Sequence, residues 1–184
     1  MAAYSLPTRL GSVLGLLILN LFMPLWGANG EALSRGEFVW VKRGAWRMAF
    51  FGTLFVSLFG IAMVLAGNLI MDLWVGRSFK NQEFVLIFVV ASAAVTATTA
   101  PYNMILNALG RADLQILPWI CFACLTIGLK LILVSPDRIW YASAITFFAY
   151  SCTIMPAILL LSKRALRRAS ERAHPVAAEL PIPR

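Results

Sequence analysis

The sequence predicts an all-α fold, a multi-pass membrane helix bundle of about five transmembrane helices, and three observations support this prediction. Hydrophobic residues make up 60% of the 184 residues and charged residues only 13%, whereas soluble domains are about 45–50% apolar and about 25% charged. Four stretches of 21 to 27 residues contain no charge, and a helix needs roughly 20 apolar residues to cross a membrane. A fifth stretch, from Leu114 to Val134, contains one charge, Lys130. This composition excludes a disordered chain, a disulfide scaffold and a nucleic-acid-binding domain.

The charge-free stretches place five predicted spans within a transmembrane domain of residues 1–165. The spans cover residues 10–27, 48–71, 84–106, 116–134 and 139–161. We expect Pro24 to kink the end of the first span and Pro156 to kink the end of the last, because proline removes a backbone donor.

The segment between the first two spans, residues 31–47, mixes charges with Trp40 and Trp46. Aromatic residues beside basic ones are typical of the headgroup boundary. We therefore expect a short interfacial helix here. The alternative is a loop followed by the start of the second span.

The second span contains small residues at helical spacing, which let two helices approach closely. They are Thr53, Ser57, Gly60 and Gly67, together with Val64. We interpret this stripe as a packing face.

Polar residues follow one helical face in the third span and one in the fifth. They are Ser92, Thr96, Thr99 and Asn103, and then Ser143, Thr146, Tyr150 and Thr153. Steps of three and four place each set on one side of its helix. Hydroxyl and amide groups prefer a partner helix or a wet cavity to lipid, so packing and cavity lining are both open interpretations.

Lys130 is the one ionisable residue within a predicted span. It lies four residues before Val134, about 6 Å along a helix, so its side chain can extend to the membrane interface. The alternative is a cation that lines a cavity and meets an anionic headgroup.

The cations predict the topology, since Lys and Arg concentrate in cytoplasmic loops. Five spans with a cytoplasmic C-terminus place eleven cations inside and four outside, and they put the N-terminus outside. The alternative is a cleaved signal peptide, with Arg9 before an apolar run and a small-residue zone at residues 27–30, which inverts the count. The net charge of +8 thus indicates a side of the membrane, and we expect no nucleic-acid partner.

We expect residues 166–184 to form a basic, disordered cytoplasmic tail, most clearly beyond Ala173, where Ala and Pro are frequent. A basic cluster begins just before it. Its members are Lys163, Arg164, Arg167, Arg168 and Arg172. We interpret the cluster as an anchor on anionic lipid, and a specific partner site is the alternative.

The residues that enzymes and metal sites require are scarce in this sequence. All eight acidic residues lie outside the spans, and His174 is the one histidine. Cys121 and Cys124 form a C-x-x-C within a span, which we interpret as helix packing, because no second pair accompanies it. We therefore expect no catalytic residues, no metal site and no cofactor.

Three local patterns, taken together, resemble a known family. They are Pro24-Leu25-Trp26 with Glu31-Ala32 and Arg35-Gly36-Glu37, then Leu73-Trp74-Val75-Gly76, then Leu106-Asn107-Ala108-Leu109-Gly110-Arg111. Their order and spacing resemble the P-L-W … E-A-x-x-R-G-[DE], L-W-[IV]-G and L-N-A-[LI]-G-[KR] segments of lipid-linked oligosaccharide flippases of the polysaccharide biosynthesis type. These belong to the multidrug/oligosaccharidyl-lipid/polysaccharide exporter superfamily. The resemblance covers roughly residues 2–165.

The resemblance implies a C-terminal fragment, part of one lobe of a two-lobed transporter. Such proteins move undecaprenyl-diphosphate-linked sugars across the bacterial inner membrane through a central cavity. The expected partners are the lipid bilayer, a lipid-linked oligosaccharide, and a missing N-terminal lobe or second chain. The candidate cavity-lining residues are Ser92, Thr96, Thr99, Asn103, Lys130, Ser143, Thr146 and Tyr150. The candidate gate residues in the loops are Glu31, Arg35, Asn107 and Arg111.

Three other functions are compatible with the same sequence. The first is a small accessory or scaffold subunit, in which the polar faces only pack helices. The second is a transporter remnant without activity, because one lobe alone cannot enclose a two-lobed cavity. The third is a lipid-modifying enzyme, which would require an acidic or histidine pair at the interface, and the sequence offers no such pair.

Overall fold

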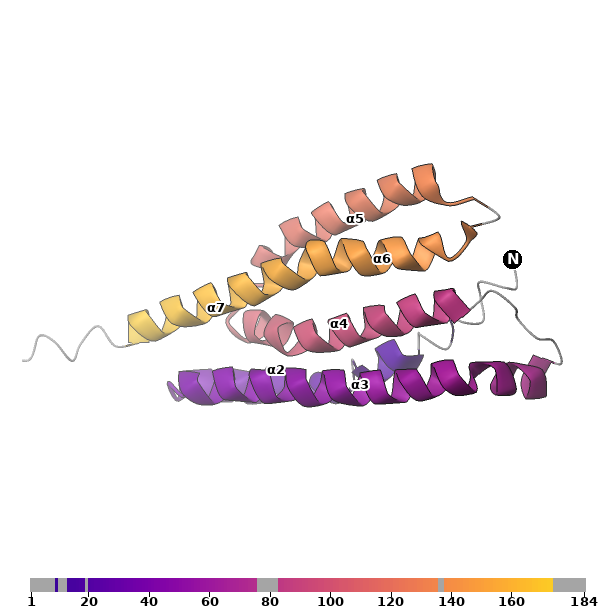
Figure 1. Cartoon of the computed structure of the whole chain (residues 1–184). Helices are drawn as coiled ribbons and strands as arrows, with labels where there is room; N and C mark the ends of the chain where they lie inside the picture. Colours follow the sequence, from indigo (N-terminus) through magenta and orange to yellow (C-terminus); the bar gives the residue numbers. More distant parts are fainter. Residues whose placement is uncertain (1–8, 10–12, 19, 76–82, 136–137, 174–184) are drawn as a thin grey trace, which may run out of the picture.

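The computed structural model describes residues 9, 13–18, 20–75, 83–135 and 138–173, and helices dominate them (Figure 1). Residues 13–18 and 20–22 are helical and precede α2. The helices that follow are α2 (Pro24–Ser34), α3 (Phe38–Val75), α4 (Glu83–Ala108), α5 (Asp113–Leu133), α6 (Tyr141–Cys152) and α7 (Ile154–Ala173).

Five helical stretches are long and apolar enough to cross a membrane, judged by length and composition. They are Val13–Ser34, Phe38–Ala66, Glu83–Ala108, Asp113–Leu133 and Tyr141–Ala173. The predicted all-α fold with about five membrane helices is therefore confirmed.

The short interfacial helix expected over residues 31–47 is wrong. Residues up to Ser34 complete α2, and one uninterrupted helix, α3, begins at Phe38 and continues to Val75. No proline interrupts the chain between Phe38 and the second predicted span, so nothing in the backbone ends a helix there.

Two prolines coincide with interruptions in the helices. α2 begins at Pro24, where the missing N–H costs nothing. Thr153 separates α6 from α7, because Pro156 has no N–H for the carbonyl of Cys152. The Thr153 hydroxyl donates to the Ala149 carbonyl at 2.6 Å.

The helix α7 continues through Ala173, so residues 166–173, expected to be disordered, are helical. The physical reason is tertiary packing: Leu166 is buried in a cluster with Ala32, Val41 and Ile105. Residues 174–184 of the predicted tail lie outside the described residues.

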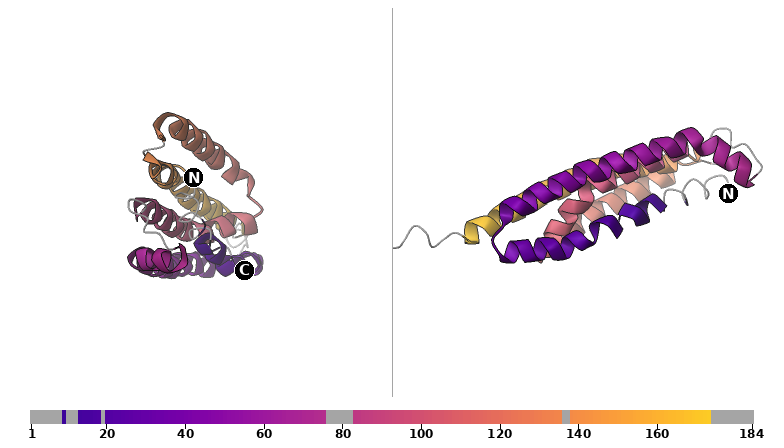
Figure 2. Two further views of the ribbon diagram at one scale, coloured as in Figure 1. Left: turned by 90° about the vertical axis from the view of Figure 1, so that its right-hand side faces the viewer. Right: turned by 90° about the horizontal axis from the view of Figure 1, so that it is seen from below.

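The bundle is organised around α4. This helix contacts α2, α3, α6 and α7, while α5 contacts α6 and α7. Figures 1 and 2 show α3 on one side of α4 and α6 on the other, with α5 beyond α6. Residues of α4 contribute to all three hydrophobic clusters of the core, with Val90, Ile105 and Leu106 as examples.

Small residues let α3 approach its neighbours closely. A Cβ added at Gly60 would overlap the Val90 side chain of α4, and one added at Gly52 would overlap the Phe22 ring. Thr53 and Thr98 share a hydrogen bond of 2.7 Å between α3 and α4. Part of the predicted packing stripe is thus confirmed, and the surroundings of Gly67 lie outside the described side chains.

Two helix ends close with the same turn. After α2, Glu37 N–H donates to the Ala32 carbonyl at 2.9 Å, and after α4, Arg111 N–H donates to the Leu106 carbonyl at 2.8 Å. The residue before each donor is a glycine with positive φ, Gly36 at 75° and Gly110 at 66°. These are Schellman turns, in which glycine adopts the left-handed conformation without a steric penalty.

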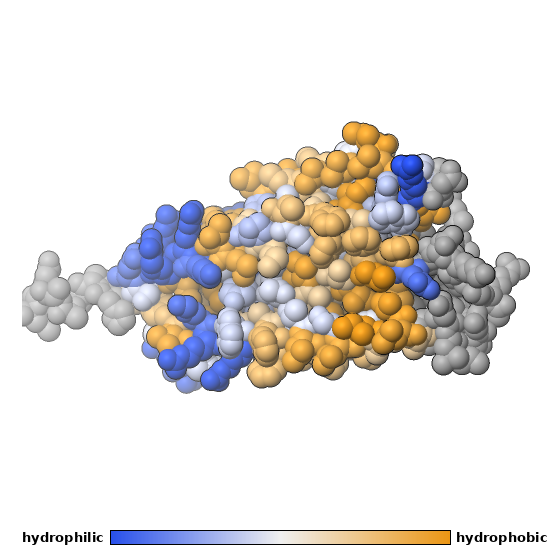
Figure 3. All heavy atoms as spheres, in the orientation of Figure 1, coloured by the Kyte–Doolittle hydropathy of each residue, from blue (hydrophilic) through white to orange (hydrophobic). Residues whose placement is uncertain are grey.

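Both turns lie at the end of the bundle where the C-terminal part of α7 also lies (Figure 1). We call this the basic end. Figure 3 shows hydrophilic residues gathered there, beside a wide hydrophobic belt over the middle of the molecule. The basic residues at this end are Arg35, Lys42, Arg43, Arg47, Arg111, Lys163, Arg164, Arg167, Arg168 and Arg172.

Replacing Gly60 tests the contact between α3 and α4. Gly60→Ala is expected to lower the free energy of unfolding by about 1–3 kcal/mol, the usual cost of overpacking, because Val90 occupies the space. The measurement is unfolding by SDS in mixed micelles. Gly128→Ala on α5 is the control, since an added Cβ meets nothing there, and it is expected to be neutral or slightly stabilising. Equal losses in both variants would contradict the contact.

Candidate functional site

The polar faces of α4 and α6 meet in one buried hydrogen bond. The hydroxyls of Thr99 and Tyr150 lie 2.8 Å apart, and the two residues are 0% and 7% exposed. The two helices run in the same direction (Figure 1), so Ser92 and Ser143, each seven residues earlier, lie at about the same level. We call seven of the residues on these two faces, all except Thr153, the polar seam. They are Ser92, Thr96, Thr99, Asn103, Ser143, Thr146 and Tyr150.

Several hydroxyls of the seam satisfy their hydrogen bonds within their own helix. Ser92 donates to the Phe88 carbonyl at 2.7 Å, Thr96 to the Ser92 carbonyl at 2.9 Å, and Thr146 to the Ala142 carbonyl at 2.9 Å. A hydroxyl bonded in this way can face an apolar neighbour with its donor satisfied. These three residues therefore require neither a ligand nor a partner helix.

Two other polar atoms of the seam have no partner. Asn103 Oδ1 and Ser143 Oγ are buried and accept or donate no hydrogen bond among the described residues. An unpaired polar group in a membrane interior costs several kcal/mol by order of magnitude. A ligand with hydroxyl groups would relieve that cost.

Asn29 on α2 is a polar residue that the sequence analysis did not select. It is 1% exposed, and neither its amide nitrogen nor its amide oxygen has a partner in the described part of the chain. Its one local signal is that it is the single amide within the small-residue run Gly27–Gly30. In the sequence, that run resembled the cleavage zone of a signal peptide. The burial of Asn29 depends on contacts of α2 with later helices, which a local pattern does not reveal.

Lys130 lies in the last turn of α5, one turn beyond the buried Thr126. It is half-buried, and no carboxylate pairs with it among the described residues. Lys130 lies three positions before the helix end at Leu133, and a lysine side chain can span that distance. Both interpretations of Lys130 stay open.

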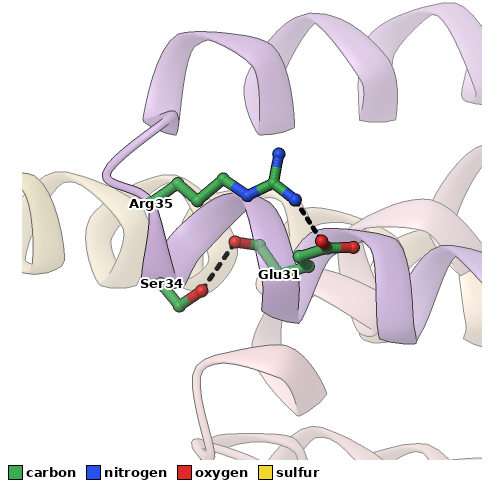
Figure 4. A network of polar contacts seen from close by, with 3 residues as sticks. All are labelled: Glu31, Ser34 and Arg35. Carbon is green, nitrogen blue, oxygen red and sulfur yellow. Dashed lines mark hydrogen bonds and ion pairs between the residues drawn. The ribbon is translucent and has the colours of Figure 1, made fainter.

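The candidate gate residues form local pairs at the basic end. Arg35 donates to the carboxylate of Glu31 one turn earlier in α2, and Ser34 Oγ donates to the Glu31 carbonyl at 2.7 Å (Figure 4). Asn107 accepts from the Gln115 amide at 2.8 Å, which links α4 to α5. Arg111 Nε donates to Asp113 at 3.3 Å. These contacts hold the two turns in shape, and a gating role stays a prediction.

A groove lined by arginines lies between the α4–α5 turn and α7, and the sequence analysis did not identify it. Its volume is about 190 Å³. Its lining residues are Leu109, Arg111, Leu114, Leu161, Arg164, Ala165, Arg168, Ala169 and Arg172. We call it the arginine groove. The sequence did not indicate this groove, because its arginines stand in two separate features. Arg111 belongs to the motif after the third span, and Arg164, Arg168 and Arg172 belong to the basic cluster near the C-terminus.

The described residues hold no group of three or more His, Cys, Asp or Glu side chains placed to bind a metal ion. Cys121 and Cys124 are both exposed on α5, so the expectation that they pack against another helix is wrong for this chain. Helix α5 contacts mainly α6 and α7, with one hydrogen bond to α4 between Gln115 and Asn107, and its buried residues are Pro118 and Thr126.

The chain matches no protein-family model, no curated protein and no solved structure. Two of the three patterns behind the resemblance end in the Schellman turns at Gly36 and Gly110. In the third, Leu73-Trp74-Val75 ends α3, and Gly76 lies outside the described residues.

A double-mutant cycle tests the hydrogen bond in the polar seam. Thr99→Val and Tyr150→Phe are expected to couple by about 0.6 kcal/mol, and by no more than about 1.7 kcal/mol, as interhelical hydrogen bonds do in membranes. Unfolding in mixed micelles provides the measurement. The control cycle pairs Thr99→Val with Thr146→Val, whose hydroxyl bonds to its own helix, and its coupling is expected to be near zero. Zero coupling in the first cycle would contradict the bond.

Asn29→Leu is expected to stabilise the fold by about 1–3 kcal/mol, because it removes an unpaired buried amide at similar volume. Asn29→Asp is expected to destabilise it strongly, since it buries a charge. Thermal unfolding in detergent measures both. A loss of stability in Asn29→Leu would mean that the amide has a partner.

Proposed function

We propose that this multi-pass membrane protein is the C-terminal part of a polysaccharide-type lipid-linked oligosaccharide flippase. In this proposal it belongs to one lobe of a two-lobed transporter of the bacterial inner membrane. It acts together with an N-terminal lobe or second chain to move undecaprenyl-diphosphate-linked sugars, and it performs no catalytic step.

The observation that supports this best is the polar seam with its unpaired atoms. Asn103 Oδ1 and Ser143 Oγ are buried without partners in the described residues, and sugar hydroxyls are groups that could pair with them. Lys130 adds one cation, which could balance part of a diphosphate charge. The resemblance at the helix ends supports the family, and the seam supports the chemistry of the substrate.

A second candidate, a scaffold or accessory subunit, is favoured by a different observation. The bond between Thr99 and Tyr150 uses two seam residues for packing alone. In that case the seam positions would never meet water or substrate. An inactive transporter remnant would give the same result.

Cysteine accessibility distinguishes these proposals. Cysteine is introduced at Asn103 or Thr96 in the full chain, with Cys121, Cys124 and Cys152 replaced by alanine. The expected result is reaction with a membrane-impermeant thiol reagent, slowed severalfold by an undecaprenyl-diphosphate-linked oligosaccharide. A cysteine at Leu125, an exposed position on α5, is the control and is expected to show no such protection.

Two results would contradict the flippase proposal. One is labelling of the Asn103 and Thr96 positions only by lipid-soluble reagents. The other is equal labelling with and without the lipid-linked oligosaccharide. Crosslinking to a partner chain, with no transport defect when the gene is deleted, would favour the scaffold.

A further inference from the structure

The arginine groove combines residues from two places far apart in the sequence. Leu109 and Arg111 come from the α4–α5 turn and Leu114 from the start of α5, and the other lining residues come from α7. On α7 they recur at steps of one and three, from Leu161 to Arg172, so they occupy one face of the helix. Ala165 and Ala169, which alternate with the arginines along α7, add small side chains to the lining. The volume of about 190 Å³ far exceeds the roughly 10–15 Å³ that one water requires.

The charges around the groove are not balanced. Three of its four arginines, Arg164, Arg168 and Arg172, form no ion pair with any described carboxylate. Arg111 reaches Asp113 only through Nε, so the two terminal nitrogens of its guanidinium have no ion-pair partner in the described chain. Four guanidinium groups around one hollow repel one another and attract an anion. Their planar donors match the oxygens of a phosphate.

The apolar part of the lining decides which phosphate compound fits. Leu109, Leu114 and Leu161 line the groove together with the arginines, so the lining is partly apolar and partly cationic. A soluble phosphate would gain nothing from the leucines. A lipid would place its phosphate among the arginines and its first acyl carbons against the leucines.

We propose that the arginine groove binds the phosphate headgroup of an anionic membrane phospholipid at the basic end of the bundle. The site is separate from the polar seam and does not depend on the transport proposal. It holds one lipid in a defined place, unlike a general attraction between a basic tail and an anionic surface.

Lipid titration of the full chain in detergent micelles tests the proposal, with native mass spectrometry to count the bound lipids. Phosphatidylglycerol is expected to bind in preference to phosphatidylcholine. The double variant Arg164→Gln/Arg168→Gln is expected to weaken phosphatidylglycerol binding about 30-fold, because each cation lost costs about fivefold. The matched control is Lys163→Gln/Arg167→Gln, which removes the same charge from α7 but no residue of the groove lining. Its binding is expected to change by less than about threefold.

A second variant keeps the charge and fills the hollow. Ala169→Leu is expected to weaken phosphatidylglycerol binding about tenfold, whereas a purely electrostatic surface would not respond to it. Helix content by circular dichroism checks that each variant is folded. Equal losses in the two double variants would overturn the proposal in favour of a general basic surface. Displacement of the lipid by millimolar inorganic phosphate would overturn it in favour of a site for soluble anions.

Discussion

The close packing of α4 against its neighbours is the interaction on which this bundle depends. Lipid tails are as apolar as the side chains, so burial in hydrocarbon does not drive helices together, and close contact and interhelical hydrogen bonds must do so. Around α4 both are present. Gly60 admits Val90 on the α3 side, while Thr53 and Thr98 bond on that side and Thr99 and Tyr150 on the α6 side. Thr98 and Thr99, consecutive residues of α4, thus bond to two different helices, α3 and α6.

This arrangement limits where a substrate could enter. The hydroxyl of Thr99 bonds to Tyr150 and those of Thr96 and Thr146 bond within their own helices. The unpaired atoms of the seam, Asn103 Oδ1 and Ser143 Oγ, are few and buried. If the seam opens in a transport cycle, α6 has to separate from α4, since α3 is held to α4 by glycine packing as well. The interruption at Thr153 gives α6 a place to bend independently of α7, which is anchored by Leu166.

The sequence predicted what local patterns determine and missed what distant contacts determine. Four of the five spans follow from charge-free runs, and the fifth follows from a run whose one charge is Lys130. The two Schellman turns at Gly36 and Gly110 were not predicted, because a glycine alone does not show that its φ is positive. The polar faces of α4 and α6 follow from helical periodicity, although periodicity could not tell that Thr99 would meet Tyr150. The arginine groove joins Arg111 to residues at least fifty positions away, and no local pattern reveals such a site. Asn29 is buried for the same reason, by helices that follow it in the chain.

The length of α3 has a mechanical consequence for how deeply the protein sits in a bilayer. Its 38 residues span about 57 Å, nearly twice the hydrocarbon thickness of about 30 Å. Fitting all of α3 into the hydrocarbon would require an inclination of about 60°, beyond the 0–40° range of membrane helices. Part of the helix therefore stands in the headgroup layer, and Lys42, Arg43 and Arg47 in its first turns are the residues suited to that layer. We expect these cations to stay in the headgroup layer, so that the thickness of the bilayer decides how much of the opposite end of α3 lies in the hydrocarbon.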